Sequence, residues 1–304
     1  MGLLISQETL ALEALTLEAL ASEALTSEAG TLEKKTLEKE TLETPANESR
    51  AMVFDCRSHL GNLSQGKRDF DSGHIPGAQH ADLDQHLAGA PGAGGRHPLP
   101  DREVLAEKFR QWGINPATLI ICYDQNNGAF AARLWWLCRW LGHHNAFVLD
   151  GGLDGWIQQG HPISTVQSTF PPGDFALKPA LTKVCHVADV MGSPNTLLDA
   201  RNRARYSGEV EPIDPVAGHI PGAISVPFSD NLSEGYFKPA EELKQRFENL
   251  DLAPDSPLVC YCGSGVTAIH NVLALLVAGY PEPALYAGSW SEWIADPDRP
   301  IETA

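Results

Sequence analysis

The chain has 304 residues, of which 43% are apolar and 20% charged, and its formal net charge is −17. This composition is typical of a globular protein with a sizeable core, and the length predicts about two domains. The negative charge argues against nucleic acid and against an anionic membrane surface as partners.

Residues 1–50 form a low-complexity acidic tail in which Glu recurs at every fifth position from Glu8 to Glu48. On a helix this period turns by about 140° per repeat, so no apolar stripe forms. The tail has neither the basic start and apolar core of a secretory signal nor the acid-poor composition of a transit peptide. We expect it to be disordered or at most nascent helix, with no fold of its own.

After residue 50 the chain repeats itself. Four blocks recur in the same order at offsets between 137 and 145 residues: 53–57 with 197–201, 73–78 with 218–223, 121–124 with 259–262, and 149–156 with 286–293. Such agreement indicates a tandem duplication. We predict domains at 51–165 and 184–304, joined by a linker at 166–183 that is marked by Pro171, Pro172 and Pro179.

Each repeated unit alternates short β-branched strands with helical runs. In the first unit, 118–123 and 146–149 are predicted strands and 130–141 a predicted apolar helix. This order predicts an α/β fold in which each domain has a mainly parallel sheet flanked by helices. Ligands of such folds bind beyond the carboxyl ends of the strands.

The second unit places a thiol at such a strand end. A buried strand is predicted at 258–261, followed by the loop Cys262-Gly263-Ser264-Gly265-Val266-Thr267 and then an apolar helix. Free N–H groups and the positive end of the helix dipole lower the pKa of a cysteine in such a loop, which favours nucleophilic chemistry. The alternative is a buried structural cysteine. The first unit has Asp124 at this position, so only the second unit is expected to be catalytic.

The other five cysteines lie at positions 56, 122, 138, 185 and 260. No C-x-x-C pair, zinc spacing or disulfide framework is present. We therefore expect no metal, no cofactor and a reducing, cytoplasmic compartment. No apolar run is long enough for a membrane span.

These motifs together resemble the two-domain sulfurtransferases of the rhodanese superfamily, over about residues 51–296. The resemblance rests on Asp-x-Arg, Gly-His-Ile-Pro-Gly-Ala in both units, the cysteine loop and the ending Gly-Ser-Trp-Ser-Glu-Trp. It implies two tandem rhodanese-like domains. The uncharged loop C-G-S-G-V-T is similar to that of 3-mercaptopyruvate sulfurtransferases, whereas thiosulfate:cyanide sulfurtransferases more often have basic residues after the cysteine.

The resemblance also implies site residues. Cys262 would carry a persulfide, cradled by the N–H groups of Gly263, Gly265, Val266 and Thr267. Arg205, in Ala204-Arg205-Tyr206, would bind the anionic donor, and His74 would relay a proton through Ser264. Three of these residues have a structural alternative. Ser264 and Thr267 could cap the helix, and His74 could fix the turn of its motif, since His219 has the same motif in the second unit.

One position departs from the family pattern. Mercaptopyruvate enzymes usually have a second arginine in Glu-Pro-Arg, where this chain reads Glu211-Pro212-Ile213. Arg203 is a candidate to compensate. Arg57 and Arg201 follow the strand-end aspartate in both units, which suggests structural salt bridges instead of substrate contacts.

The expected activity is transfer of sulfane sulfur from 3-mercaptopyruvate to a thiol acceptor such as thioredoxin or glutathione, or to cyanide. Thiosulfate as donor is the main alternative, and a non-catalytic sulfur-relay or binding module is another. A dual-specificity phosphatase would need an arginine where Ala268 stands.

Overall fold

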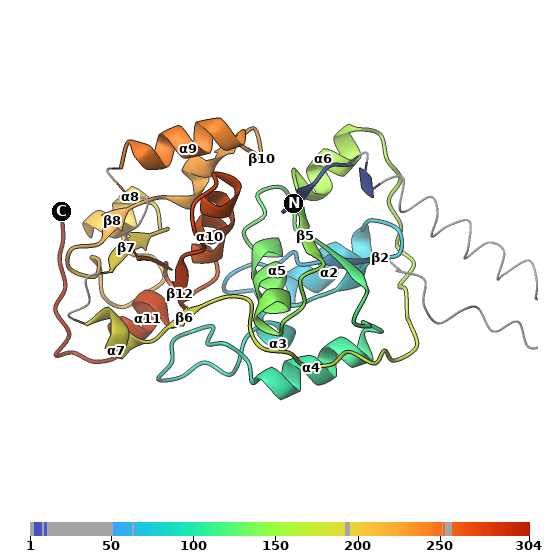
Figure 1. Cartoon of the computed structure of the whole chain (residues 1–304), viewed down its shortest axis with the longest axis horizontal. Coiled ribbons are helices and arrows are strands. Elements are labelled where there is room, and N and C mark those ends of the chain that lie inside the picture. Colours follow the sequence, from blue (N-terminus) through green and yellow to red (C-terminus); the bar gives the residue numbers. More distant parts are fainter. Residues whose placement is uncertain are drawn as a thin grey trace, which may run out of the picture.

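The duplicated sequence folds into two parallel sheets that lie in two lobes side by side (Figure 1). The computed structural model describes residues 3–7, 9–10, 51–62, 64–191, 195–250, 252 and 257–304. The first sheet has the order β1-β5-β4-β2-β3 and the second the order β6-β12-β11-β7-β8, with every neighbouring pair parallel. The two orders are equivalent strand for strand, as expected from a duplication.

The strands of the first sheet are β1 (Leu4–Ile5), β2 (Ala51–Asp55), β3 (Gln79–His80), β4 (Leu119–Tyr123) and β5 (Ala146–Leu149). Those of the second are β6 (Val184–Cys185), β7 (Thr196–Asp199), β8 (Ile224–Ser225), β11 (Leu258–Tyr261) and β12 (Ala284–Tyr286), and β9 (Leu232–Ser233) pairs with β10 (Tyr236–Phe237) in a separate hairpin. The first lobe has the helices α2 (Gln65–Ser72), α3 (Leu83–His86), α4 (Arg102–Gln111), α5 (Ala131–Trp140) and α6 (Gly152–Gln158). The second has α7 (Val187–Val190), α8 (Arg203–Ser207), the 3-10 helix η1 (Phe228–Asn231), α9 (Ala240–Glu248), α10 (Ala268–Val277) and α11 (Ser289–Trp293).

The central strands and the helices that follow them confirm the sequence prediction. β11 and its counterpart β4 are almost wholly buried apolar runs, as strands covered on both faces must be. α10 follows β11 after the six-residue loop 262–267, and α5 follows β4 at the equivalent place. The loop that contains Cys262 therefore lies at the carboxyl end of a central strand.

The amino-terminal residues correct the predicted domain boundary. Leu4 and Ile5 pair with Val148 and Leu149 at the edge of the first sheet, where β6 lies in the second. Gln7 donates a hydrogen bond to the Asp150 carbonyl at 2.6 Å, so these residues are part of the first domain. The expectation of an unfolded tail from residue 1 to 50 does not hold for them. Most of the glutamate repeat lies in 11–50, outside the described residues.

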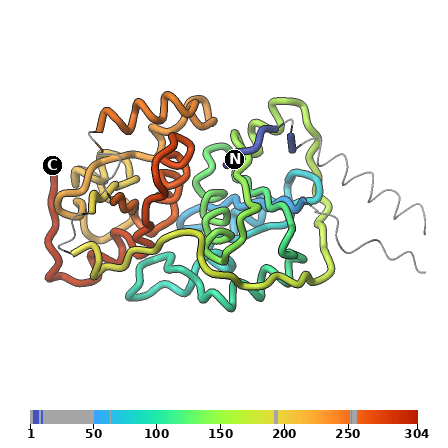
Figure 2. The backbone as a smooth tube through the Cα atoms, in the orientation of Figure 1, coloured from blue at the N-terminus to red at the C-terminus, as the bar shows by residue number. Residues whose placement is uncertain are grey.

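The linker follows the surface of the first lobe before it enters the second (Figure 2). Its backbone N–H groups bond to carbonyls of the first lobe, from Gly173 to Arg110 and from Lys178 to Leu141. Among the described residues, no helix is long and apolar enough to cross a membrane.

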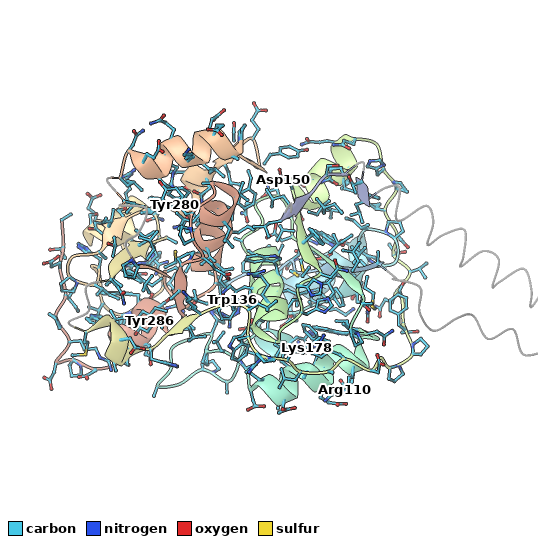
Figure 3. All side chains as sticks on the ribbon, in the orientation of Figure 1. Arg110, Trp136, Asp150, Lys178, Tyr280 and Tyr286 are labelled. Carbon is cyan, nitrogen blue, oxygen red and sulfur yellow. The ribbon has the colours of Figure 1, made fainter. Side chains whose placement is uncertain are left out.

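One hydrophobic cluster of buried residues spans both lobes, and each lobe has a second cluster of its own. Helices α5 and α10 pack against each other and are apolar on nearly all sides, which is the pattern of helices buried between layers. Trp136 and Asp150 lie along the boundary of the lobes (Figure 3). Polar contacts across this boundary include Arg139 to Glu282 at 2.6 Å and the N–H of Phe237 to Asp150 Oδ1 at 2.8 Å. The site between the lobes is therefore held by a continuous interface.

Arg133 of α5 is a fully buried cation in this interface. Within the described residues its guanidinium donates to backbone carbonyls alone: Leu87, His97 and Pro98 of the first lobe at 3.1–3.3 Å, and Gly265 of the cysteine loop at 2.9 Å. Burial lowers the pKa of Arg133 to about 10, which still leaves it charged at neutral pH. One side chain thus connects a first-lobe loop to the cysteine loop.

Replacement of this cation tests its structural role. Arg133→Met leaves the buried carbonyls of Leu87, His97 and Gly265 without this donor, at a cost of about 1–3 kcal/mol for an unsatisfied group, so we expect a loss of at least about 2 kcal/mol in the free energy of unfolding. Urea denaturation measures it. Arg68→Met, which changes an exposed arginine of α2, should stay within about 0.5 kcal/mol of the unmodified protein. Equal stability of the two variants would contradict this role for Arg133.

Candidate active site

Cys262 lies at the end of β11 in a cradle of hydrogen-bond donors and is 2% exposed. Burial raises the pKa of its thiol, but the Thr267 hydroxyl and the N–H groups of Ser264, Ala268 and Val266 outweigh burial and hold the pKa below the ordinary value of 9.0. Donors that bond to the charged form favour that form. The site therefore stabilises a thiolate, and it can stabilise the anionic sulfur of a persulfide in the same way.

The backbone conformation of the loop requires a glycine at position 265 and is held by a hydrogen bond to Ser289. Gly265 has a φ of +72°, and a methyl group on its Cα would lie 2.2 Å from the Ala287 carbonyl oxygen, so no larger residue fits. The Cys262 N–H donates to Ser289 Oγ at 3.1 Å, and the Ser289 hydroxyl donates to the Tyr286 carbonyl at 2.9 Å. Sequence reasoning noted the motif that contains Ser289 but not this contact.

The thiol faces a cavity of about 430 Å³ between the lobes. Its lining includes Leu60, Arg96, Asn127, Ala129 and Phe130 from the first lobe and Arg201, Asn202, Arg205, Phe228, Ser229, Cys262, Gly263, Ser264, Val266 and Thr267 from the second. Six of the eight predicted site residues are therefore brought together at this cavity. Gly265 is not among the lining residues; it packs against the Ala287 carbonyl on the other side of the loop.

His74, in contrast, is not brought to the cysteine loop. Its ring is fully buried in the first lobe, where Nδ1 lies 2.7 Å from the Phe70 carbonyl oxygen and Nε2 lies 3.0 Å from that of Val166. His219 has an equivalent position in the second lobe, with Nδ1 2.8 Å from the Tyr206 carbonyl oxygen. Both histidines thus fix the turn of their shared motif.

The histidine that contacts Ser264 is His97. Its Nδ1 lies 2.7 Å from Ser264 Oγ, and its Nε2 lies 3.3 Å from Asp84 Oδ1. Burial, with the positive charges of Arg133 and Arg96, lowers the pKa of His97 to about 4, so the ring is neutral at neutral pH. A neutral ring that donates from Nε2 to the carboxylate accepts at Nδ1 from the Ser264 hydroxyl. Sequence reasoning missed His97 because its loop has no counterpart among the repeated blocks.

Arg205 lies at the cavity with its guanidinium held by two acids. Its Nε is 2.9 Å from Glu211 Oε2, and its Nη2 is 2.9 Å from Asp214 Oδ2. Arg57 and Arg201 are paired with the strand-end Asp55 and Asp199 at 2.7 and 2.6 Å, which agrees with the structural role expected for both.

The first lobe has an equivalent cradle that is filled by its own side chain. Asp124 accepts hydrogen bonds from the N–H groups of Gly128 and Phe130, each at 2.9 Å, and of Ala131 at 3.3 Å. A carboxylate thus takes the place that the thiolate has in the second lobe. Among the described residues, no group of three His, Cys, Asp or Glu side chains is placed to hold a metal ion.

Comparison with known proteins points to one family. The model of the rhodanese-like domain matches residues 38–159 and 186–296. The chain is 50% identical over 267 residues to a probable 3-mercaptopyruvate sulfurtransferase of Pseudomonas aeruginosa, which covers 84% of this chain and 94% of the relative. It is 39% identical to a putative thiosulfate sulfurtransferase of Mycobacterium tuberculosis, over 82% of this chain and 89% of the relative.

A solved structure agrees with these sequence matches. The crystal structure of SseA from Escherichia coli, described as a 3-mercaptopyruvate sulfotransferase, superposes with a TM-score of 0.70 at 32% identity. It covers 79% of this chain and 93% of that structure.

The cradle predicts the pH dependence of thiol reactivity. Alkylation of Cys262 by iodoacetamide should reach half its maximal rate below pH 9, because its pKa is lowered. Thr267→Val keeps the side-chain shape but removes the hydroxyl donor, so we expect this midpoint to rise. Mass spectrometry of the alkylated peptides measures it, with Cys260, fully buried in β11 directly before the loop, as the internal unreactive control. An unchanged midpoint in Thr267→Val would contradict the role of the hydroxyl.

Proposed function

The chain belongs to the rhodanese-like domain family, and we propose that it is a sulfurtransferase that moves sulfane sulfur from 3-mercaptopyruvate through a Cys262 persulfide. The observation that carries this proposal is the anion cradle around Cys262, open to a cavity large enough for a small donor. The uncharged residues Gly263 and Ser264 after the cysteine, and the names of the similar proteins, support 3-mercaptopyruvate over thiosulfate.

The first half-reaction forms the persulfide. The Cys262 thiolate attacks the sulfur of the donor, the new S–S bond forms and the C–S bond breaks, so its electron pair stays on carbon as the enolate of pyruvate. The donor's S–H proton must then reach that carbon. The chain Ser264–His97–Asp84 is placed to accept this proton and return it, because neutral His97 takes a proton at Nδ1 while Asp84 stabilises the resulting charge. The products are pyruvate and the anionic persulfide.

The second half-reaction returns the thiolate. A thiol acceptor such as thioredoxin or glutathione, or cyanide, attacks the outer sulfur, and the S–S bond breaks towards Cys262. The cradle N–H groups stabilise the leaving sulfur anion, as an oxyanion hole stabilises oxygen. The six unpaired cysteines support a reducing, cytoplasmic setting.

Assays with 3-mercaptopyruvate and with thiosulfate test both the donor preference and the role of Cys262 as the nucleophile. We expect kcat/KM for 3-mercaptopyruvate to exceed that for thiosulfate by more than about tenfold with one acceptor. Cys262→Ser should abolish turnover of both donors. Asp124→Ala, the matched change in the other cradle, should keep most of it, since the contacts of that carboxylate are with N–H groups of its own loop and of the start of α5. A preference for thiosulfate would favour the rhodanese reaction, and no turnover of either donor by folded protein would favour a relay or binding module.

The proton relay is tested by a donor that needs no carbon protonation. Thiosulfate releases sulfite, whereas 3-mercaptopyruvate releases an enolate. His97→Gln should therefore lower kcat for 3-mercaptopyruvate by about 100-fold or more, and kcat for thiosulfate much less. Steady-state assays of both donors measure the ratio. His74→Gln should leave the ratio unchanged. Equal losses with both donors in His97→Gln would rule out this relay.

A further inference from the structure

Two guanidiniums, one from each domain, lie over the backbone next to Cys262. A methyl group placed on the Gly263 Cα would lie 2.8 Å from Arg96 Nη2 and 3.3 Å from Arg205 Nη2. Both arginines line the cavity that contains Cys262. The pKa of Arg96 is lowered, mainly by burial. The nearby thiolate of Cys262 raises this pKa and the nearby charge of Arg205 lowers it, as expected for a guanidinium close to both groups.

Asp214 fixes the two guanidiniums relative to each other. It is almost fully buried, and its Oδ1 bonds to Arg96 Nη1 while its Oδ2 accepts from Arg205 Nη2 at 2.9 Å. Within the described part of the chain, Arg96 Nη2 and Arg205 Nη1 have no hydrogen-bond acceptor. These N–H groups lie on the Gly263 side, so the pair has donors left for an incoming anion.

Arg96 is held in this position by the same loop that supplies His97. In Figure 1 the segment between α3 and α4 extends from the first lobe to the second. Gly95 has a φ of +99°, and a methyl group on its Cα would lie 2.7 Å from both the Gly288 carbonyl oxygen and Ser291 Oγ. The Arg96 N–H donates to the same Ser291 Oγ at 3.1 Å. The tip of the loop is therefore fixed against the second domain, and Arg96 does not have to be ordered by the donor.

The other candidate arginine does not share this position. Arg203 is 73% exposed and its Nη2 lies 3.5 Å from Asp230 Oδ2, and it is not among the residues that line the cavity. Ile213, where the family pattern has an arginine, is 43% exposed and has no charge to offer. The sequence-based suggestion that Arg203 compensates is thus not supported. Of the cavity-lining arginines, Arg201 is bound to the strand-end Asp199, so Arg96 is the one placed beside Arg205 to bind an anion.

We propose that Arg96 of the first domain binds the carboxylate of a 2-oxo acid donor together with Arg205 of the second domain, and so determines donor specificity. This inference rests on the proposed function. A planar carboxylate matches two adjacent guanidinium edges, and the carboxylate would then sit across the domain boundary beside the Cys262 loop. The 2-oxo acid is held at its carboxylate end, which leaves its sulfur end free to reach the thiolate.

The experiment compares Arg96→Met with Arg203→Met as the matched control. Loss of a charge-assisted contact should raise KM for 3-mercaptopyruvate, and the inhibition constant of pyruvate, by roughly 10- to 100-fold in Arg96→Met. Arg203→Met should change neither. The reaction of the preformed persulfide with dithiothreitol, which has no carboxylate, should keep its rate in both variants. A role of Arg96 in domain packing alone would instead alter both half-reactions.

The outcomes separate this inference from the proposed function. Turnover of 3-mercaptopyruvate by the unmodified protein tests the function, and the ratio of variant to unmodified protein tests Arg96. If Arg96→Met has KM and pyruvate inhibition within about twofold of the unmodified enzyme, the inference is overturned while the function stands. Should Arg96→Met fail to fold, Arg96→Gln, which can still donate to Asp214, takes its place with the same expected rise and the same overturning result.

Discussion

Each domain binds one anion in a cradle of N–H groups between a central strand and the helix that follows it. In the second domain the anion is the Cys262 thiolate, and in the first it is the Asp124 carboxylate. The N–H groups of each loop converge on one buried point, and without an acceptor there they would lose their hydrogen bonds at a cost in free energy. Both domains therefore have a cradle with an acceptor in it. The Asp124 carboxylate cannot carry sulfur, whereas the Cys262 thiolate can. Asp124 turns one cradle into a structural element.

The first domain has no cysteine in its own cradle, and it contributes residues to the cavity at Cys262 instead. Its loop between α3 and α4 crosses to the second domain and brings Arg96 and His97 to the cysteine loop. Arg133 donates to the carbonyls of both His97 and Gly265, so one buried cation fixes the distance between this histidine and the cysteine loop. The site is complete only at the domain interface.

Much of the fold could be predicted because the repeated blocks are the parts that the two domains share. Strand β11, the helix after it and the predicted role of the Arg201–Asp199 pair follow from local pattern and repetition. His97 could not be found in this way, because it belongs to an unrepeated loop and acts on a serine 167 residues away. His74 stands in a repeated motif and was assigned a catalytic role, yet its two ring nitrogens bond to backbone carbonyls. Leu4 and Ile5 were missed because the acidic repeat separates them from β2.

The charges that complete the site act on the thiolate and on the histidine in opposite ways. Arg96 and Arg133 lie near Cys262, and their positive charges favour its anionic form. The same charges disfavour a protonated His97, whose pKa burial and these two arginines lower to about 4. A thiolate and a neutral imidazole are the states that sulfur attack and proton acceptance require. The cradle and these charges therefore favour the thiolate before a donor binds, and His97 is already neutral at neutral pH.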